Sequence, residues 1–95
     1  MNDPYEVQLA SSAHRQLRRL PPKVAVAVIE FITAVLPANP LRLSEALTGE
    51  FAELRSARRG DYRVLIRVDE DTRTVLVLRI AHRAELYRPP SPSTE

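Results

Sequence analysis

The sequence contains no cysteine, two glycines and two histidines, and this scarcity excludes several kinds of functional site. Without cysteine there is no disulfide, no thiolate metal site and no cysteine nucleophile. The two histidines, His14 and His82, are too few for a zinc site unless carboxylates complete it. The two glycines exclude the glycine-rich loops that hold phosphates in P-loop and dinucleotide-binding proteins. We therefore expect a domain that needs neither a metal ion nor another cofactor.

The sequence also shows no apolar run long enough to span a membrane and no recognisable targeting segment. The longest apolar stretch, residues 24–36, is interrupted by Glu30 and is too short to span a bilayer as a helix. Residues 1–8 include acidic side chains and lack the apolar centre of a signal peptide. These features predict a cytoplasmic protein that does not enter the membrane. Residues 1–88 have room for one core, and the Pro- and Ser-rich residues 89–95 are predicted to form a disordered tail.

Arginine supplies nearly all of the positive charge. The fourteen basic residues are thirteen arginines and Lys23, and twelve acidic residues reduce the net charge to +2. The planar guanidinium matches the oxygens of a phosphate and stays charged at any physiological pH. A GC-rich genome would also favour arginine over lysine. The positions of the arginines, rather than their number, therefore carry the argument.

The first half of the chain is predicted to contain one strand and two helices. Apolar and polar residues alternate over residues 5–9, which indicates a half-buried strand. Ser11 and Ser12 are candidate N-caps of a first helix. A second helix is expected over Lys23–Leu36, because Pro22 suits the first turn of a helix. Its most buried stripe is expected to consist of Val24, Val28, Phe31 and Val35.

The second half changes to the two-residue period of strands. We expect a strand of uncertain register within Phe51–Arg58, a turn at Gly60-Asp61, and two further strands joined by the polar residues 69–72. The residues expected to face the core are Tyr62, Val64, Ile66 and Val68 on one strand and Leu76, Leu78 and Ile80 on the next. The predicted fold is α+β in the order β-α-α-β-β-β, with two N-terminal helices packed on one face of a small, mainly antiparallel sheet.

Arginines recur on the sheet face that the helices would leave open. Its expected members are Arg63, Arg67 and Arg79, with Arg83 on the extension of the last strand and either Arg58 or Arg59 on the neighbouring strand. His82 would point the opposite way, toward the core. A positive sheet face of this kind suits a phosphodiester. The alternative is an ordinary solvated sheet face, which is polar in any case.

Two stretches resemble the RelE/ParE toxin superfamily. Residues 54–65, LRSARRGDYRVL, resemble its central strand pair, in which an arginine-bearing strand precedes a Gly-Asp-Tyr-Arg turn and strand. Residues 80–88, IAHRAELYR, are similar to its C-terminal His-Arg-x-x-x-Tyr signature. The helical half fits through the basic, leucine-containing residues 15–21 and the Asn-Pro pair at 39–40. The resemblance covers the chain from about Tyr5 to Arg88 and implies a RelE-like fold.

The resemblance also implies an activity and the residues that perform it. RelE-type members are toxins of type II toxin–antitoxin systems, and they cleave mRNA in the ribosomal A site by attack of a ribose 2′-hydroxyl on the adjacent phosphate. By resemblance, Arg63 and Arg83 would stabilise the added negative charge, one of them donating a proton late. Arg58 would contact the phosphate, and Tyr87 would orient or stack on a base. The further arginines expected to bind nucleic acid are Arg55, Arg59, Arg67 and Arg79.

The chain departs from the family pattern at the general base. Leu54 and Ser56 occupy the positions of two lysines, one of which is a proposed base, and neither Asp61 nor Glu85 is an evident substitute. His82 is expected in the core rather than at the reaction. Either positioning within the ribosome supplies most of the rate, or this member is a weak nuclease.

Other functions stay open on the sequence alone. ParE-like toxins share the fold and inhibit DNA gyrase without doing chemistry; the missing lysines favour this alternative, and Tyr87 argues against it. A third alternative is a binding module or decayed toxin, against which the intact arginine set argues. Either toxin function implies a RelB-like antitoxin partner, and the nuclease also implies the ribosome and mRNA. Free DNA binding by this chain alone is not expected.

Overall fold

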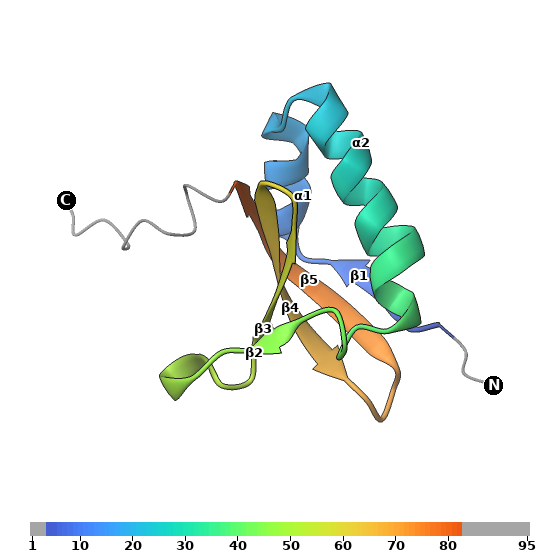
Figure 1. The fold of residues 1–95 in the computed structure, drawn as a ribbon, viewed down its shortest axis with the longest axis vertical. Coiled ribbons are helices and arrows are strands. Elements are labelled where there is room, and N and C mark those ends of the chain that lie inside the picture. The colour runs from blue at the N-terminus through green and yellow to red at the C-terminus, as the bar shows by residue number, and fades with distance from the viewer. Residues whose placement is uncertain (1–3, 83–95) are drawn as a thin grey trace.

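A computed structural model describes residues 4–82, which form two helices packed against one face of a five-stranded sheet (Figure 1). The strands are β1 (Glu6–Leu9), β2 (Glu45–Ala46), β3 (Arg55–Arg59), β4 (Tyr62–Asp69) and β5 (Thr74–His82). Their order is β1-β5-β4-β3-β2, with β1 parallel to β5 and the other neighbours antiparallel. The predicted α+β architecture is confirmed, with β2 as an additional strand. The predicted tail at 89–95 lies outside the described residues.

The first helix, α1 (Ser11–Arg19), begins without the serine cap that the sequence suggested. Ala10 is its N-cap, and no side chain caps the first turn. The Ser12 hydroxyl instead donates a hydrogen bond to the Leu78 carbonyl of β5 at 2.6 Å. The serine prediction was wrong because the helix starts at Ser11, so that Ala10 is the N-cap and both serines lie inside the first turn.

The second helix, α2 (Pro22–Glu30), starts at Pro22 as expected and continues through a π-helical turn and a 3₁₀ turn. These turns are η1 (Phe31–Val35) and η2 (Leu36–Ala38). The expected stripe is buried at Val28 and Phe31 and half-buried at Val24 and Val35. Ile32 and Leu36 are buried as well, so the apolar face is wider than the sequence indicated. No helix within residues 4–82 is long and apolar enough to cross a membrane.

A β-bulge at Leu78 changes which residues of β5 face the core. Val77 pairs with β4, Leu78 has no partner residue, and pairing resumes with the next residue. One extra residue reverses the alternation of side chains along a strand. The prediction that Leu76 and Leu78 face the helices is therefore wrong, and Val75 and Val77 are buried in their place. Ile80, beyond the bulge, lies in the core as predicted.

The strand predicted from Phe51 begins later than expected, because the residues before β3 form a turn. Gly49, with φ of 69°, begins the 3₁₀ turn η3 (Gly49–Phe51), and Phe51 is 53% exposed. The strand predicted from Phe51 therefore starts only at Arg55. The turn predicted at Gly60-Asp61 is confirmed and joins β3 to β4, with Gly60 at φ of 59°. A positive φ of this kind is readily adopted by glycine.

Candidate nucleic-acid interface

Four arginines lie on the sheet face opposite the helices. Residues that pair across antiparallel strands point to the same face. Arg58 of β3 lies opposite Arg63 of β4, which in turn lies opposite Ala81 of β5. Arg79 and Arg67 occupy the same face further along β5 and β4. We call Arg58, Arg63, Arg67 and Arg79 the arginine face.

The pairing of Arg58 with Arg63 is unusual for a sheet. Side chains directly opposite one another have their Cβ atoms about 5 Å apart, and like charges in this position destabilise the pair of strands. A sheet face that only had to be soluble would alternate charges of both signs. Two cations held together in this way favour an anion that can lie between them.

A groove of about 350 Å³ adjoins this pair of arginines. One wall is the segment 42–47, which includes β2, and the other is formed by β3 and β4 through Ser56, Arg58 and Arg63. Because Glu45 pairs with Ser56, the glutamate lies on the same side of the sheet as the two arginines. Glu45 is the acidic residue among those lining the groove.

Arg55 holds the wall of the groove in place. Its Nε donates a hydrogen bond to Ser44 Oγ at 2.7 Å, and one terminal nitrogen donates to the carbonyls of Ser44 and Leu41 at 2.9 and 3.1 Å. Ser44 Oγ donates in turn to the Pro40 carbonyl at 2.6 Å. Arg55 lies opposite Ile66, on the helix side of the sheet. The structure therefore places Arg55 away from the arginine face. The sequence had predicted that Arg55 binds nucleic acid together with the arginines of that face.

Arg59 also lies on the helix side of the sheet. It pairs with Tyr62, and its guanidinium carbon is 5.4 Å from the centre of the Phe31 ring. The Phe31 and Tyr62 rings meet edge to face at 6.4 Å, and the Tyr62 hydroxyl donates to the Ala27 carbonyl at 3.2 Å. Burial raises the pKa of the Tyr62 hydroxyl, with Arg59 opposing the shift and Glu30 adding to it. Arg58, not Arg59, is thus the residue of this strand on the arginine face.

The remaining predicted residues are Arg67 and Arg79, which belong to the arginine face, and Arg83 and Tyr87. Arg67 lies at the far end of the face and forms an exposed ion pair with Glu53 at 3.7 Å. Arg79 is exposed on β5. Arg83 and Tyr87 lie outside the described residues, so their roles stay predictions. Within residues 4–82, no three histidine, aspartate or glutamate side chains gather in a way that could hold a metal ion.

The sequence did not predict that Glu45 lines the groove. An acidic side chain lines the groove together with two arginines, and the sequence predicted no strand between Leu36 and Phe51. Because β2 is two residues long, it has no alternation from which its orientation could be read. Only the pairing of Glu45 with Ser56 brings the carboxylate to the groove.

Comparisons with known proteins bear on the fold and the family of this chain. The model of the family described as ParE toxin of type II toxin–antitoxin system, parDE, matches residues 7–87. Two curated relatives from Mycobacterium tuberculosis are Toxin RelG, 46% identical over 90% of this chain and 98% of that protein, and Toxin RelE, 44% identical over 90% and 88%. The toxin–antitoxin complex RelBE2 from the same organism contains a chain with a TM-score of 0.83 and 44% identity, covering 85% of this chain and 100% of that one. A doubly substituted mutant of the Escherichia coli toxin RelE, in its free state, shares the fold at 17% identity and a TM-score of 0.69, over 90% of this chain and 88% of that one.

Proposed function

Because this chain belongs to the ParE toxin family of type II toxin–antitoxin systems and is a toxin of the RelE kind, we propose that it is a ribosome-dependent endoribonuclease. It cleaves mRNA in the ribosomal A site and thereby inhibits translation. The ribose 2′-oxygen attacks the adjacent phosphorus, the bond from phosphorus to the 5′-oxygen breaks, and a 2′,3′-cyclic phosphate and a 5′-hydroxyl result. The reaction needs no metal or other cofactor.

The observation that carries the proposal is the Arg58–Arg63 pair beside the groove. As the 2′-oxygen attacks, the phosphate gains negative charge, and two guanidinium groups close to it stabilise that charge more than they stabilise the starting phosphate. A phosphate that lies between the two guanidinium groups can accept charge-assisted hydrogen bonds from both of them.

Glu45 is the best candidate for the general base. An arginine remains protonated at physiological pH and cannot accept the 2′-hydroxyl proton. A carboxylate can, and Glu45 reaches the groove from the wall opposite Arg63. It would therefore serve in place of the lysines that the family pattern has at Leu54 and Ser56. By family resemblance, Arg83 assists the leaving 5′-oxygen and Tyr87 holds the substrate base.

The proposal is tested by single-turnover cleavage of mRNA on programmed ribosomes with purified protein. Glu45→Gln should lower the maximal rate by about 10²- to 10⁴-fold, because the amide cannot accept the 2′-hydroxyl proton. Arg63→Gln should lower it by about 10²- to 10³-fold. Glu50→Gln and Arg18→Gln change the same charges at exposed positions outside the groove and should match the unmodified protein.

Two results would point elsewhere. If Glu45→Gln cleaves like Glu50→Gln, the carboxylate is not the base. If the unmodified protein cuts no message but arrests growth and produces linearised plasmid, the chain acts on DNA gyrase, as the ParE-like alternative predicts.

The same proposal includes a RelB-like antitoxin as partner and the cytoplasm as the place of action. The structural relatives include RelB–RelE complexes from Mycobacterium tuberculosis, Pyrococcus horikoshii and Methanococcus jannaschii, which supports a protein antitoxin. The open arginine face suits an acidic chain that covers it when translation must proceed. Recognition of operator DNA would belong to the antitoxin, with no free DNA binding by this chain.

A further inference from the structure

The first helix carries a concentration of positive charge that the groove does not use. Residues 11–19 contain His14, Arg15, Arg18 and Arg19 and no acidic residue. All four side chains are exposed, and none forms an ion pair with another residue in the described range 4–82. The helix dipole favours cations in the last turn, which accounts for Arg18 and Arg19. It does not account for Arg15.

The helix is attached to the open edge of β5 by two side chains. The parallel partner strand β1 ends where Leu9 pairs with Val77, so within residues 4–82 no strand neighbours the edge of β5 beyond this point. The Ser12 hydroxyl donates to the Leu78 carbonyl, and the Ile80 amide donates to Gln16 Oε1, both at 2.6 Å. These bonds fix α1 alongside the part of β5 that carries Arg79.

The rotation of α1 sets which of its arginines adjoin the arginine face. Successive residues of an α-helix are about 100° apart, so Arg15 and Arg19 lie about 60° and 20° to one side of the direction in which Ser12 points. The core residues Ala13 and Leu17 lie on the other side of that direction. Because Ser12 points at the edge of β5, the flank with Arg15 and Arg19 turns toward the arginine face.

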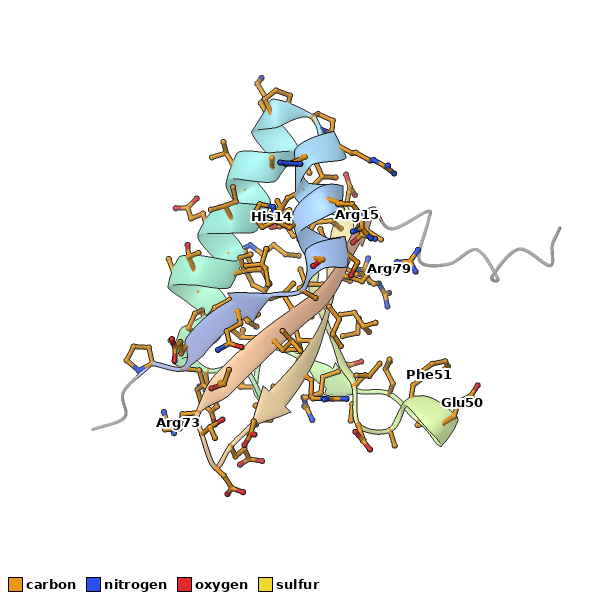
Figure 2. The ribbon with its side chains drawn as sticks, turned by 180° about the vertical axis from the view of Figure 1, so that it is seen from behind. His14, Arg15, Glu50, Phe51, Arg73 and Arg79 are labelled. Atoms are coloured by element: carbon orange, nitrogen blue, oxygen red, sulfur yellow. The ribbon has the colours of Figure 1, made fainter. Side chains whose placement is uncertain are left out.

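The side-chain positions agree with this orientation. Gln16 and Ile80, which are hydrogen-bonded, directly follow Arg15 and Arg79 in the sequence. Figure 2 shows Arg15 and Arg79 at the same end of the sheet, with Arg73 at the opposite end. Positive charge therefore continues from the groove at Arg63, across Arg79, onto α1.

We propose that Arg15 and Arg19 of α1, together with Arg79, form a second phosphate-binding surface that docks the protein on ribosomal RNA. This inference rests on the proposed function. The groove beside Arg63 is lined by residues 42–47, β3 and β4, and β5 lies between β4 and α1, so we assign Arg15 and Arg19 to a phosphate outside the groove. Arg15, Arg19 and Arg79 are all exposed and lie outside the groove, which suits the backbone of a folded RNA and not the reacting nucleotide. It contributes affinity for the ribosome and leaves the rate of the chemical step unchanged.

The test compares two doubly substituted proteins of equal net charge. Arg15→Gln with Arg19→Gln removes the proposed contacts, and Arg18→Gln with Lys23→Gln removes two exposed charges further round α1 and at the start of α2. Binding is measured by sedimentation with ribosomes programmed with an mRNA that carries 2′-deoxynucleotides in the A-site codon, so that nothing is cleaved. Cleavage of an ordinary mRNA is measured in parallel, as is the melting temperature of each variant.

For Arg15→Gln with Arg19→Gln, we expect ribosome binding on the order of tenfold weaker at 0.1 M salt, with a salt dependence reduced by about one unit of slope per lost phosphate contact. The maximal cleavage rate should be unchanged, and the control should bind within about twofold of the unmodified protein. Equal ribosome binding by the two double variants would overturn the proposal. Weakened binding to the acidic antitoxin, with ribosome binding intact, would overturn it as well and assign α1 to that partner.

The same experiments distinguish a failure of the proposed nuclease function from a failure of the docking surface. If the unmodified protein binds ribosomes but never cleaves, the nuclease assignment fails while the docking surface is still measured by sedimentation. If the unmodified protein does not bind ribosomes at all, both fail.

Discussion

Arg55 offers the sharpest separation between a structural and a nucleic-acid-binding role. Its guanidinium donates three hydrogen bonds that attach residues 41–44 to β3, and these residues lead into the groove wall that carries Glu45. A hydrogen bond from a charged group contributes about 1.5–3 kcal/mol when buried, and less where water competes. The Arg55 side chain is partly exposed, so we take about 1 kcal/mol for each bond. Arg55→Ala should then lower the free energy of unfolding by about 2–3 kcal/mol.

Urea and thermal denaturation of the isolated protein measure this loss. For a domain of this size, 1 kcal/mol lowers the melting temperature by about 4–8 °C, so the variant should melt at least 8 °C lower. Arg55→Lys keeps the charge but cannot form the same fork of bonds, and it should lose most of the same stability. In a double-mutant cycle, Ser44→Ala and Arg55→Ala should couple, because they remove the same hydrogen bond. If Arg55→Ala is as stable as the unmodified protein and only its RNA binding falls, the structural role is refuted and the sequence assignment stands.

Three further predictions concern stability. Tyr62→Phe removes the hydrogen bond to Ala27 and should cost about 1 kcal/mol by urea denaturation at pH 7. Because the folded state raises the pKa of Tyr62 above its ordinary value of 10.0, the protein should lose stability as the pH rises above 10, and Tyr62→Phe should lose less; equal losses in the two proteins would contradict this. Gly60→Ala should cost about 1 kcal/mol in thermal denaturation through its positive φ alone, since an added Cβ meets no atom within 4 Å, and an unchanged melting temperature would argue against that backbone conformation. Gln16→Ala leaves the Ile80 amide at the edge of β5 without its acceptor and should speed amide exchange there; unchanged protection would mean that another group covers the edge.

The parts of the fold that local chemistry determines could be predicted from the sequence. Pro22 starts α2, Gly60 turns the β3–β4 hairpin, and alternation places Val64 and Ile66 in the core, all as expected. The arginine face follows from the same alternation on β4. These features depend on residues close together in the chain.

The parts that depend on pairing between distant residues could not be predicted. The bulge at Leu78 could not be predicted, because apolar residues occupy both alternating sets of positions around it. Because of this bulge, Val75 and Val77 face the core in place of Leu76 and Leu78. The register of β3 decided that Arg58, and neither Arg55 nor Arg59, joins the arginine face. Glu45 reaches the groove only through the short strand β2.

The most direct test of the central claim is to map the 5′ ends of an abundant transcript after brief induction of the protein in a bacterial host. Primer extension is carried out in parallel cultures with translation initiation open or blocked. The proposed function predicts cuts inside the reading frame that appear only while ribosomes translate, and that disappear with Arg63→Gln but not with Arg18→Gln. Growth arrest with intact transcripts would contradict it.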